Sequence, residues 1–444
     1  MKELFKSLYL SPRFFIFVAG AAFIFLLGFF FQLIFIPAIF LFFAFLSICI
    51  LDMILLYRQK IGITASRNTP DRLSNGDENV IEISLSSNYL ISLNIEIIDE
   101  IPALFQKRDF LIVTELAPNQ RKVLDYRLRP VERGEYKFGY LNIFASSKIG
   151  FIKRRYRFDG AAVLPVYPSF LQMRKYELMA ISDKLTEVGV KKVRKLGNTF
   201  EFEQIRDYIP GDDIRAINWK ATARRNNLMV NQYSDEKSQN VYCVIDMGKS
   251  MKMPFNGMTL LDYSINASLI IADIAVYKKD NAGLLTFAKE IDAFLPASKK
   301  QGQIRKVMDL LYKQKTRFNE ANFELLHNYS KRKIKQRSLI MLFTNFESYS
   351  TIERNIPFLQ GIAKKHLLVT VFFKNTGLNS ILNKDSDKVK DIYDKTIAEN
   401  MAYEKRMIVK ELNQLGIMTV YTSPENLTID SLNKYLEIKS RRIL

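Results

Sequence analysis

The N-terminal part of the chain is one long run of apolar positions. No Asp, Glu, Lys or Arg occurs from Phe14 to Leu51, where Phe, Ile, Leu and Ala predominate. One helical crossing of a bilayer needs about 20 apolar residues, so this run is nearly long enough for two. The pattern predicts two transmembrane helices, one over about residues 14–31 and the other over about residues 33–57.

Basic residues flank this run on both sides, whereas the predicted turn, marked by Gln32 and Pro37, carries none. Loops rich in Lys and Arg stay on the cytoplasmic side, so we expect both termini and the large C-terminal part in the cytoplasm. A cleaved signal peptide is the alternative, but its apolar core would be too long and no A-x-A site follows. The flanking residues are Lys2, Lys6, Arg13, Arg58, Lys60 and Arg67.

Alternation of apolar and polar positions with a period of two begins after the apolar run. It is clearest over residues 80–85 and 91–97, and it is typical of half-buried strands. Similar short segments, separated by polar or Gly- and Pro-bearing breaks, continue to about residue 167. We predict a small antiparallel β-sandwich over residues 58–167.

The last part of the chain alternates short apolar segments with amphipathic ones. This order is typical of strands joined by helices, so we predict a doubly wound, largely parallel sheet over residues 240–444. A linker with one helix precedes it over residues 168–239. Residues 1–13 are the expected N-terminal segment and residues 14–57 the transmembrane hairpin. The expected strands are Val241–Ile245, Gly283–Phe287, Ile291–Leu295, Leu339–Phe343, Leu367–Phe373 and Met418–Tyr421.

The cysteines and histidines narrow the chemistry. The two cysteines, Cys49 and Cys243, are far apart in the chain, which excludes a disulfide framework and suits a reducing compartment. The two histidines, His327 and His366, also stand apart, so no zinc site of ordinary spacing is expected.

Basic residues are in excess, with 65 Lys and Arg against 46 Asp and Glu and a net charge of +19. Part of the excess lies in two clusters, residues 191–195 and 331–337. Neither cluster is interleaved with aromatic residues, as binding of single-stranded nucleic acid would favour. We therefore expect solvated helix ends or contact with anionic lipid headgroups, and no nucleic acid.

Residues 197–233 form the densest polar stretch of the chain and read GNTFEFEQIRDYIPGDDIRAINWKATARRNNLMVNQY. Charged side chains surround a Pro-Gly turn and the only tryptophan, and such charges must be paired if they are buried. Two interpretations remain open: a salt-bridged clasp between the β domain and the sheet domain, or a recognition surface for a protein or an anion. The candidate residues are Arg206, Asp207, Tyr208, Gly211, Asp212, Asp213, Arg215, Asn218, Trp219 and Arg224.

Residues 206–224 resemble the signature of the bacterial "domain of unknown function 58" family. Residues 132–136 and 149–152 resemble the upstream elements of that family, and Asn218 stands where many members carry Asp. The resemblance implies a von Willebrand factor A-like sheet domain in a protein of the bacterial inner membrane. It also implies a MoxR-type AAA+ ATPase as partner in chaperone-like envelope processes, with no enzymatic activity established for the family as a whole.

Domains of the A type bind Mg²⁺ through an Asp-x-Ser-x-Ser loop, a distant Thr and a further Asp, because Mg²⁺ prefers oxygen ligands. Here the loop reads Asp246-Met-Gly248-Lys-Ser250, and Asn345 stands in place of the further Asp. Thr316 is a weak candidate for the distant Thr. Asp246, Ser250 and Asn345 are thus the remains of a degenerate site, and we expect no bound metal.

Signals for catalysis are weak. The segment Gly248–Ser250 mimics the end of a phosphate loop, but Cys243 stands where that loop needs glycine. Asp212 and Asp213 could serve acid–base chemistry, but Arg215 beside them favours neutralisation. No cofactor or small-molecule substrate is evident. The leading hypothesis is a membrane-anchored, non-enzymatic scaffold or adaptor; a metal-dependent protein-binding module is the alternative, and a hydrolase is a distant third.

Overall fold

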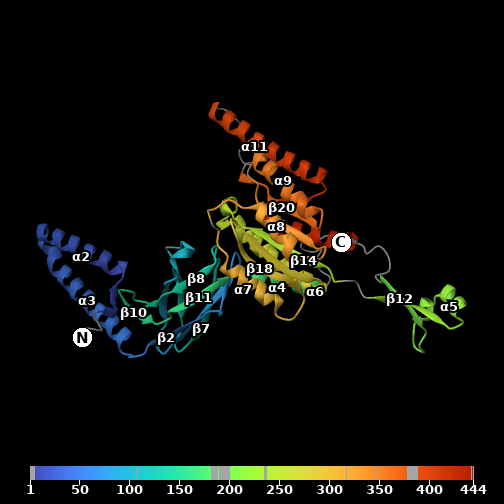
Figure 1. Ribbon diagram of the computed structural model, residues 1–444. Coiled ribbons are helices and arrows are strands. Elements are labelled where there is room, and N and C mark those ends of the chain that lie inside the picture. The colour runs from blue at the N-terminus through green and yellow to red at the C-terminus, as the bar shows by residue number, and fades with distance from the viewer. Residues whose placement is uncertain are drawn as a thin grey trace. The chain divides into compact units, whose positions relative to one another are not determined.

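The computed structural model separates the chain into two compact units, Met1–Tyr167 and Pro168–Leu444 (Figure 1). The basic cluster at residues 191–195 lies outside the described residues. The described residues are 6–107, 109–181, 189, 201–234, 238–316, 318–346, 348–377, 389–441 and 443.

Two apolar helices open the first unit, α2 (Pro12–Phe30) and α3 (Gln32–Tyr57), and both are long and apolar enough to cross a membrane. They lie against each other, with the ring of Phe17 stacked on that of Phe45 at 4.1 Å between centroids. Gly28 allows a close approach of the two helices, because a Cβ there would lie 3.3 Å from the Cα of Phe35.

The chain reverses at one extended residue, Phe31, with φ −124° and ψ 98°. Pro37 lies inside α3, so its assignment to the turn was wrong. Proline removes one backbone hydrogen bond from a helix, and a long apolar helix can contain it, since neighbouring groups satisfy the freed carbonyl in many membrane helices.

The rest of the first unit is β structure, and alternation of buried and exposed side chains is clear in β4. The sheets have the strand orders β1-β10-β9-β5-β6, β2-β4-β7 and β3-β11-β8. Pairing is antiparallel except between β3 and β11, and buried residues from all three sheets share one apolar core. The strands are β1 (Leu8–Leu10), β2 (Ile63–Asn68), β3 (Leu73–Ser74), β4 (Asn79–Ser87), β5 (Leu93–Asp99), β6 (Ile112–Leu116), β7 (Arg121–Leu128), β8 (Gly134–Phe138), β9 (Leu141–Ser146), β10 (Ile152–Phe158) and β11 (Ala162–Tyr167).

Strand β1 precedes the helices, yet it pairs with β10, which follows them. Both ends of the helix pair therefore join the same sheet. The end of α3 is bound to this sheet by Asp52, whose buried carboxylate accepts hydrogen bonds from the Ser147 hydroxyl at 2.5 Å and from the N–H groups of Phe151 and Ile152 at 3.1 and 3.0 Å. Arg154 adds hydrogen bonds of 2.7 Å to the carbonyl oxygens of residues 56 and 59.

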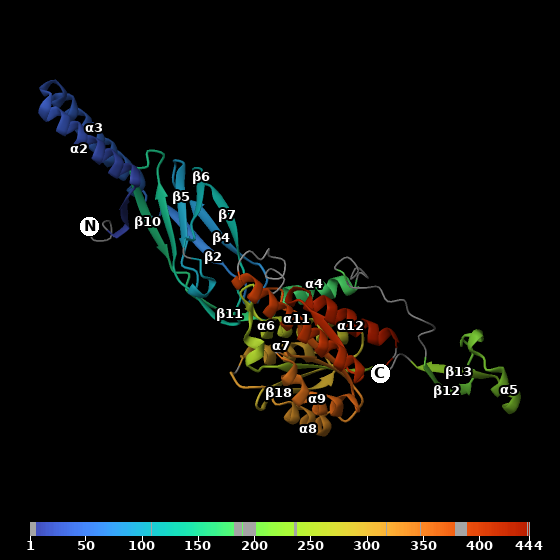
Figure 2. The same cartoon turned by 90° about the horizontal axis from the view of Figure 1, so that it is seen from above.

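The second unit contains a six-stranded sheet of order β18-β17-β14-β19-β20-β21, in which β18 alone is antiparallel to its neighbour (Figure 2). This is the largely parallel sheet that the alternation of segments predicted. The strands are β14 (Asn240–Asp246), β17 (Asn281–Phe287), β18 (Ile291–Ser298), β19 (Leu339–Phe343), β20 (Leu367–Phe373) and β21 (Met418–Thr422), with a small hairpin of β15 (Pro254–Phe255) and β16 (Met258–Thr259).

Helices cover both faces of this sheet. α6, which contacts α12, lies on one face, and α8 and α9 lie on the other, where apolar side chains of α11 also pack (Figure 1). α6 is also apolar enough to cross a membrane, but 78% of its apolar window is buried within the unit, as expected of a core helix. The helices are α4 (Phe170–Ile181), α6 (Leu260–Tyr277), α7 (Gln303–Lys313), α8 (Phe323–Lys333), α9 (Tyr349–Ala363), α11 (Val389–Gln414) and α12 (Leu427–Arg441).

A separate small element holds most of the signature residues. It consists of strands β12 (Glu201–Asp207) and β13 (Met229–Ser234), which pair antiparallel, the 3₁₀ turn Ile214–Ala216 and the short helix α5 (Trp219–Arg225). We call residues 201–234 the signature hairpin. In Figure 1 it is the green element that carries the labels β12 and α5.

Candidate functional site

Asp246 stands at the carboxyl end of β14, beside the end of the parallel strand β19. Its side chain is buried, and its two oxygens are engaged: Oδ1 accepts from the Gly248 N–H and Oδ2 from the Thr344 hydroxyl, both at 2.7 Å. Burial raises the pKa of Asp246 to about 6, although the two hydrogen bonds lower it. Asp246 thus joins the loops that follow the two central strands.

Gly248 is set by a close approach. A Cβ at this position would lie 2.9 Å from Oδ1 of Asp246 and 3.2 Å from the backbone N of Ala321. The segment before α8 packs here, where the Lys249 N–H donates to the Asn319 carbonyl at 3.0 Å. The serine that metal-binding loops carry would therefore clash here, and residues 319–321 lie against the loop.

Asn345 follows β19 and connects the loop to a distant helix. Its Nδ2 donates to the Ser250 carbonyl at 3.4 Å, and its Oδ1 accepts from Nζ of Lys405 at 3.3 Å. Lys405 belongs to α11 and is only 9% exposed. Sequence reasoning missed this lysine. The available signal was its place on the apolar face of α11, three and seven residues before the buried Ile408 and Leu412.

These residues do not fit the Mg²⁺ site that the resemblance implies. Mg²⁺ needs near-octahedral oxygen ligands at about 2.0–2.1 Å, but both oxygens of Asp246 already accept hydrogen bonds and Oδ1 of Asn345 faces an ammonium group. Among the described residues, no group of three or more His, Cys, Asp or Glu side chains could hold a metal ion.

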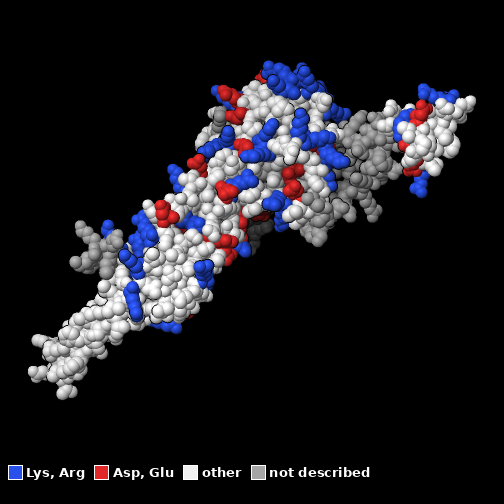
Figure 3. Space-filling model, turned by 90° about the horizontal axis from the view of Figure 1, so that it is seen from below, with Lys and Arg blue, Asp and Glu red and all other residues white. Residues whose placement is uncertain are grey.

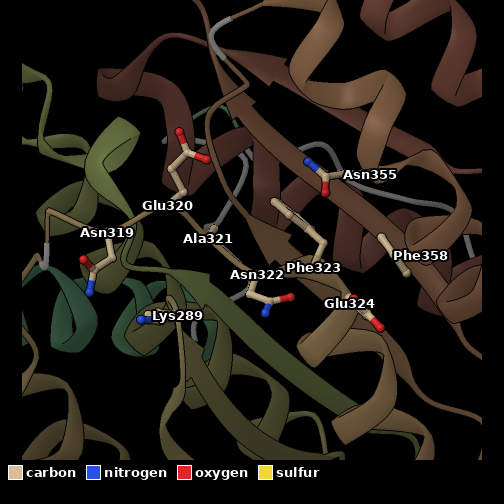
Figure 4. A pocket seen from close by; sticks show the side chains of 9 residues that line it. All are labelled: Lys289, Asn319, Glu320, Ala321, Asn322, Phe323, Glu324, Asn355 and Phe358. Carbon is tan, nitrogen blue, oxygen red and sulfur yellow. The ribbon is translucent and has the colours of Figure 1, made fainter.

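Hollows adjoin this edge. One of about 330 Å³ is lined by Asp246, Ser250, Thr344 and Asn345 together with residues of α9. A neighbouring one of about 390 Å³ shares Glu320 with it and lies between the segment before α8 and α9 (Figure 4). Figure 4 shows side chains of both kinds around this hollow, with the Phe323 ring among carboxylate and amide groups. Glu320 pairs with Lys249 at 3.0 Å.

The signature hairpin is held by one two-pronged ion pair. Arg206 donates to both carboxylate oxygens of Asp212, at 2.8 and 2.7 Å, across a turn in which Gly211 has a φ of +113°. The Ile209 N–H donates to the same carboxylate at 3.0 Å. The hydrogen bond from Arg206 lowers the pKa of Asp212. Within the described side chains of this hairpin, it is the one ion pair within 4 Å.

The other polar signature residues order the backbone. Asp213 accepts from the Arg215 N–H at 3.0 Å and begins the 3₁₀ turn. Asn218 begins α5, because its Oδ1 accepts from the Ala221 N–H at 3.0 Å, while its Nδ2 donates to Oδ1 of Asn231 at 2.8 Å. An Asp at 218 could begin the helix as well, but it has no donor for Asn231 in this arrangement. The structure thus gives a local reason for Asn218.

Large apolar side chains of the hairpin are exposed. Trp219 and Ile214 are each 68% exposed and Ile209 60%, and only Met229 and Val230 are buried among the side chains described there. Tyr208 is half-buried, and its N–H donates to the Leu228 carbonyl at 2.8 Å. The side chains of Asp207, Arg215 and Arg224 are exposed. Trp219 is therefore not a core residue of this element.

Residues 204–376 match the sequence family described as "Protein of unknown function DUF58". This region of the chain is therefore similar to the DUF58 family. A protein of Bacillus subtilis (strain 168), described as "Uncharacterized protein YeaD", is 25% identical over 173 residues, which are 38% of this chain and 40% of that protein. The match therefore spans less than half of the relative.

Solved structures resemble parts of this chain in fold. The VWA domain of SpRpn10 covers 44% of this chain and 94% of its own, at 12% identity and a TM-score of 0.28. BatB from Bacteroides thetaiotaomicron covers 46% and 100%, at 10% identity and a TM-score of 0.30. A CARDB domain from Pyrococcus furiosus covers 24% and 86%, at 16% identity and a TM-score of 0.18. These likenesses carry no information about function.

The DUF58 match begins in β12 and ends just after β20. It includes nearly the whole signature hairpin, Asp246 and Asn345. It leaves out α11, and with it Lys405.

Proposed function

We propose that this protein is a membrane-anchored, non-enzymatic adaptor that binds a protein partner through the signature hairpin. The observation that carries the proposal is the exposure of Ile209, Ile214 and Trp219 on an element held together by the Arg206–Asp212 pair and by backbone hydrogen bonds. Clustered exposed apolar side chains mark interaction sites, and Trp is favoured among residues that dominate binding energy.

The charge around these side chains indicates the kind of partner. α5 carries Lys220, Arg224 and Arg225, all exposed, and no Asp or Glu occurs over residues 214–232. An apolar hollow with an acidic rim would complement this surface, since opposite charges at an interface rim favour association. The partner that the family resemblance implies is a MoxR-type AAA+ ATPase, and we propose it as the one to test.

The membrane anchor is the second part of the proposal. It is supported by the length and apolar character of α2 and α3, and by the pairing of β1 with β10, which keeps both ends of the helix pair on one side. With basic residues flanking the pair, we place both termini and the two units in the cytoplasm of a bacterium. A reporter that is active only in the periplasm, fused after residue 444, should stay silent.

Two observations support a non-enzymatic role. Both oxygens of Asp246 are engaged by Gly248 and Thr344, and both oxygens of Asp212 by Arg206.

The positive charge is also widely spread: Figure 3 shows Lys and Arg over much of the visible face, with Asp and Glu among them. Nucleic-acid binding requires a concentrated basic face, and the proposal names no nucleic acid as partner.

The test is retention of the ATPase. The full chain in detergent would be immobilised and exposed to a purified MoxR-type ATPase from the same bacterium, with Trp219→Ala as the main variant and Phe318→Ala as control. Phe318 is an aromatic residue of the same unit that is 74% exposed but lies outside the hairpin. Truncation of a dominant residue costs about 2 kcal/mol or more, so Trp219→Ala should weaken retention at least tenfold and Phe318→Ala should not.

Folding must be separated from binding in this experiment. Arg206→Ala removes the ion pair within the hairpin, so its loss of retention alone would not identify the surface. If Trp219→Ala and Ile214→Ala melt normally and still retain the ATPase fully, the hairpin is not its docking surface.

A further inference from the structure

We propose that Lys405 supplies, from within the chain, the positive charge that metal-binding A-type domains take from Mg²⁺, so that this edge of the sheet is ordered without metal. The proposal concerns the sheet edge and does not depend on the binding role of the signature hairpin.

The contacts of Lys405 place it where a cation would join separate segments. Its Nζ lies 3.3 Å from Oδ1 of Asn345, and Nδ2 of the same amide lies 3.4 Å from the Ser250 carbonyl. The preceding residue, Thr344, donates to Asp246. The loop after β14, the loop after β19 and α11 are thus connected through one side-chain amide.

This arrangement explains why an amide stands at position 345. Asparagine presents an acceptor to the ammonium group of Lys405 and a donor to the Ser250 carbonyl at the same time. A carboxylate has no donor for that carbonyl. Asn345 and Lys405 therefore act as a pair, in which the amide accepts from the ammonium group.

The burial of Lys405 marks it as different from the other basic residues of α11. Lys405 is only 9% exposed, whereas Arg406 and Lys410 on the same helix are exposed. Burial of an ammonium group is costly unless polar partners compensate for its lost hydration. The amide of Asn345 is one such partner, so the buried ammonium group supplies a positive charge beside the loop that carries Asp246 and Ser250.

The experiment compares thermal unfolding of the full chain in detergent with about 5 mM Mg²⁺, far above the Kd of a working site, and with EDTA. The wild type should melt at the same temperature in both. Lys405→Met should melt lower than Lys410→Met, which is the matched control on the exposed side of α11. In the double variant Lys405→Met/Asn345→Asp, the ammonium group is gone and a second carboxylate lines the same hollow as Asp246, so Mg²⁺ should raise its melting temperature.

Two results would overturn the proposal. One is a wild-type chain that Mg²⁺ stabilises as much as it stabilises the double variant. The other is a Lys405→Met variant that melts with Lys410→Met. If Lys405→Met does not fold, equilibrium dialysis of the wild type against Mn²⁺ still decides the matter: we expect no retained ion, and one ion bound per chain would show that a metal, not Lys405, supplies the charge.

Discussion

The contact between α3 and the β structure of the first unit gives a sharp prediction. The carboxylate of Asp52 is fully buried and accepts three hydrogen bonds, from the hydroxyl of Ser147 and from the N–H groups of Phe151 and Ile152. Asp52→Ala removes the acceptor and leaves all three donors in place.

The magnitude follows from the number of donors. Each buried donor left without a partner costs about 1–3 kcal/mol, so three of them give a loss of about 3–6 kcal/mol once the residual access of water is allowed for. A domain is stable by about 5–15 kcal/mol in total. The variant should therefore open locally at the segment between β9 and β10, even where the helices themselves persist.

Amide hydrogen exchange of the full chain in detergent measures this opening. Phe151 and Ile152 donate their amide hydrogens to Asp52, so peptides that cover residues 147–152 should exchange at least about 100-fold faster in Asp52→Ala, since 1.4 kcal/mol is a factor of ten. Ser47→Ala is the matched control, because the Ser47 hydroxyl donates within α3 to the Phe43 carbonyl at 2.9 Å. Exchange at the wild-type rate in Asp52→Ala would refute the reasoning.

Three further predictions concern the second unit. Trp219→Ala should change stability by no more than about 0.5 kcal/mol, because the ring is 68% exposed, and chemical denaturation would show a large loss if the ring were core. Arg206→Lys keeps the charge but loses the two-pronged contact with Asp212, so trypsin should cleave the hairpin faster than in the wild type, and equal rates would contradict the role of the pair. Burial, and secondarily the negative charge of Glu177, raises the pKa of Asp273 from 3.8 to about 7. The folded protein is therefore most stable, with respect to this group, below pH 3.8, where Asp273 is protonated. This stability is lost as the pH rises through 7, by up to about 4 kcal/mol at 1.36 kcal/mol per pKa unit. Asp273→Asn should accordingly raise the melting temperature at pH 8 and flatten its dependence on pH, whereas an unchanged profile would show that Asp273 ionises normally.

The helices and the main strands could be predicted because their signal is local. The apolar run of α2 and α3, the alternation in β4 and the apolar strands β14 and β19 all follow from side chains a few residues apart. Strand β1 was missed, since it has three residues and owes its conformation to pairing with β10. Pro37 was assigned to the turn because proline is common in turns, but a long apolar helix can also contain it.

Contacts of charged side chains could likewise be predicted only where the partners are close in sequence. Arg206 and Asp212 are six residues apart, and their pairing could be expected from the sequence. The carboxylate of Asp52 meets its donors at separations of 95 to 100 residues, and Lys405 meets Asn345 at a separation of 60. The spacing of Lys405 from Ile408 and Leu412 indicates which face of α11 it shares, but only the packing of α11 buries it and brings it to Asn345.

The long-range contacts also distinguish charged residues that stabilise the fold from those that are available for binding. Asp52 and Lys405 are buried at junctions, where a charge orders several backbone segments at once and where a substitution leaves donors or acceptors unsatisfied. The charges of α5 are exposed beside Trp219, where they cost little in stability and remain available to another molecule. If this division holds, variants of the first kind should lose the fold together with any binding, and variants of the second kind should lose binding alone. Measuring melting temperature and ATPase retention on the same samples separates the two, and a hairpin variant that unfolds the second unit would contradict the assignment of its charges to recognition.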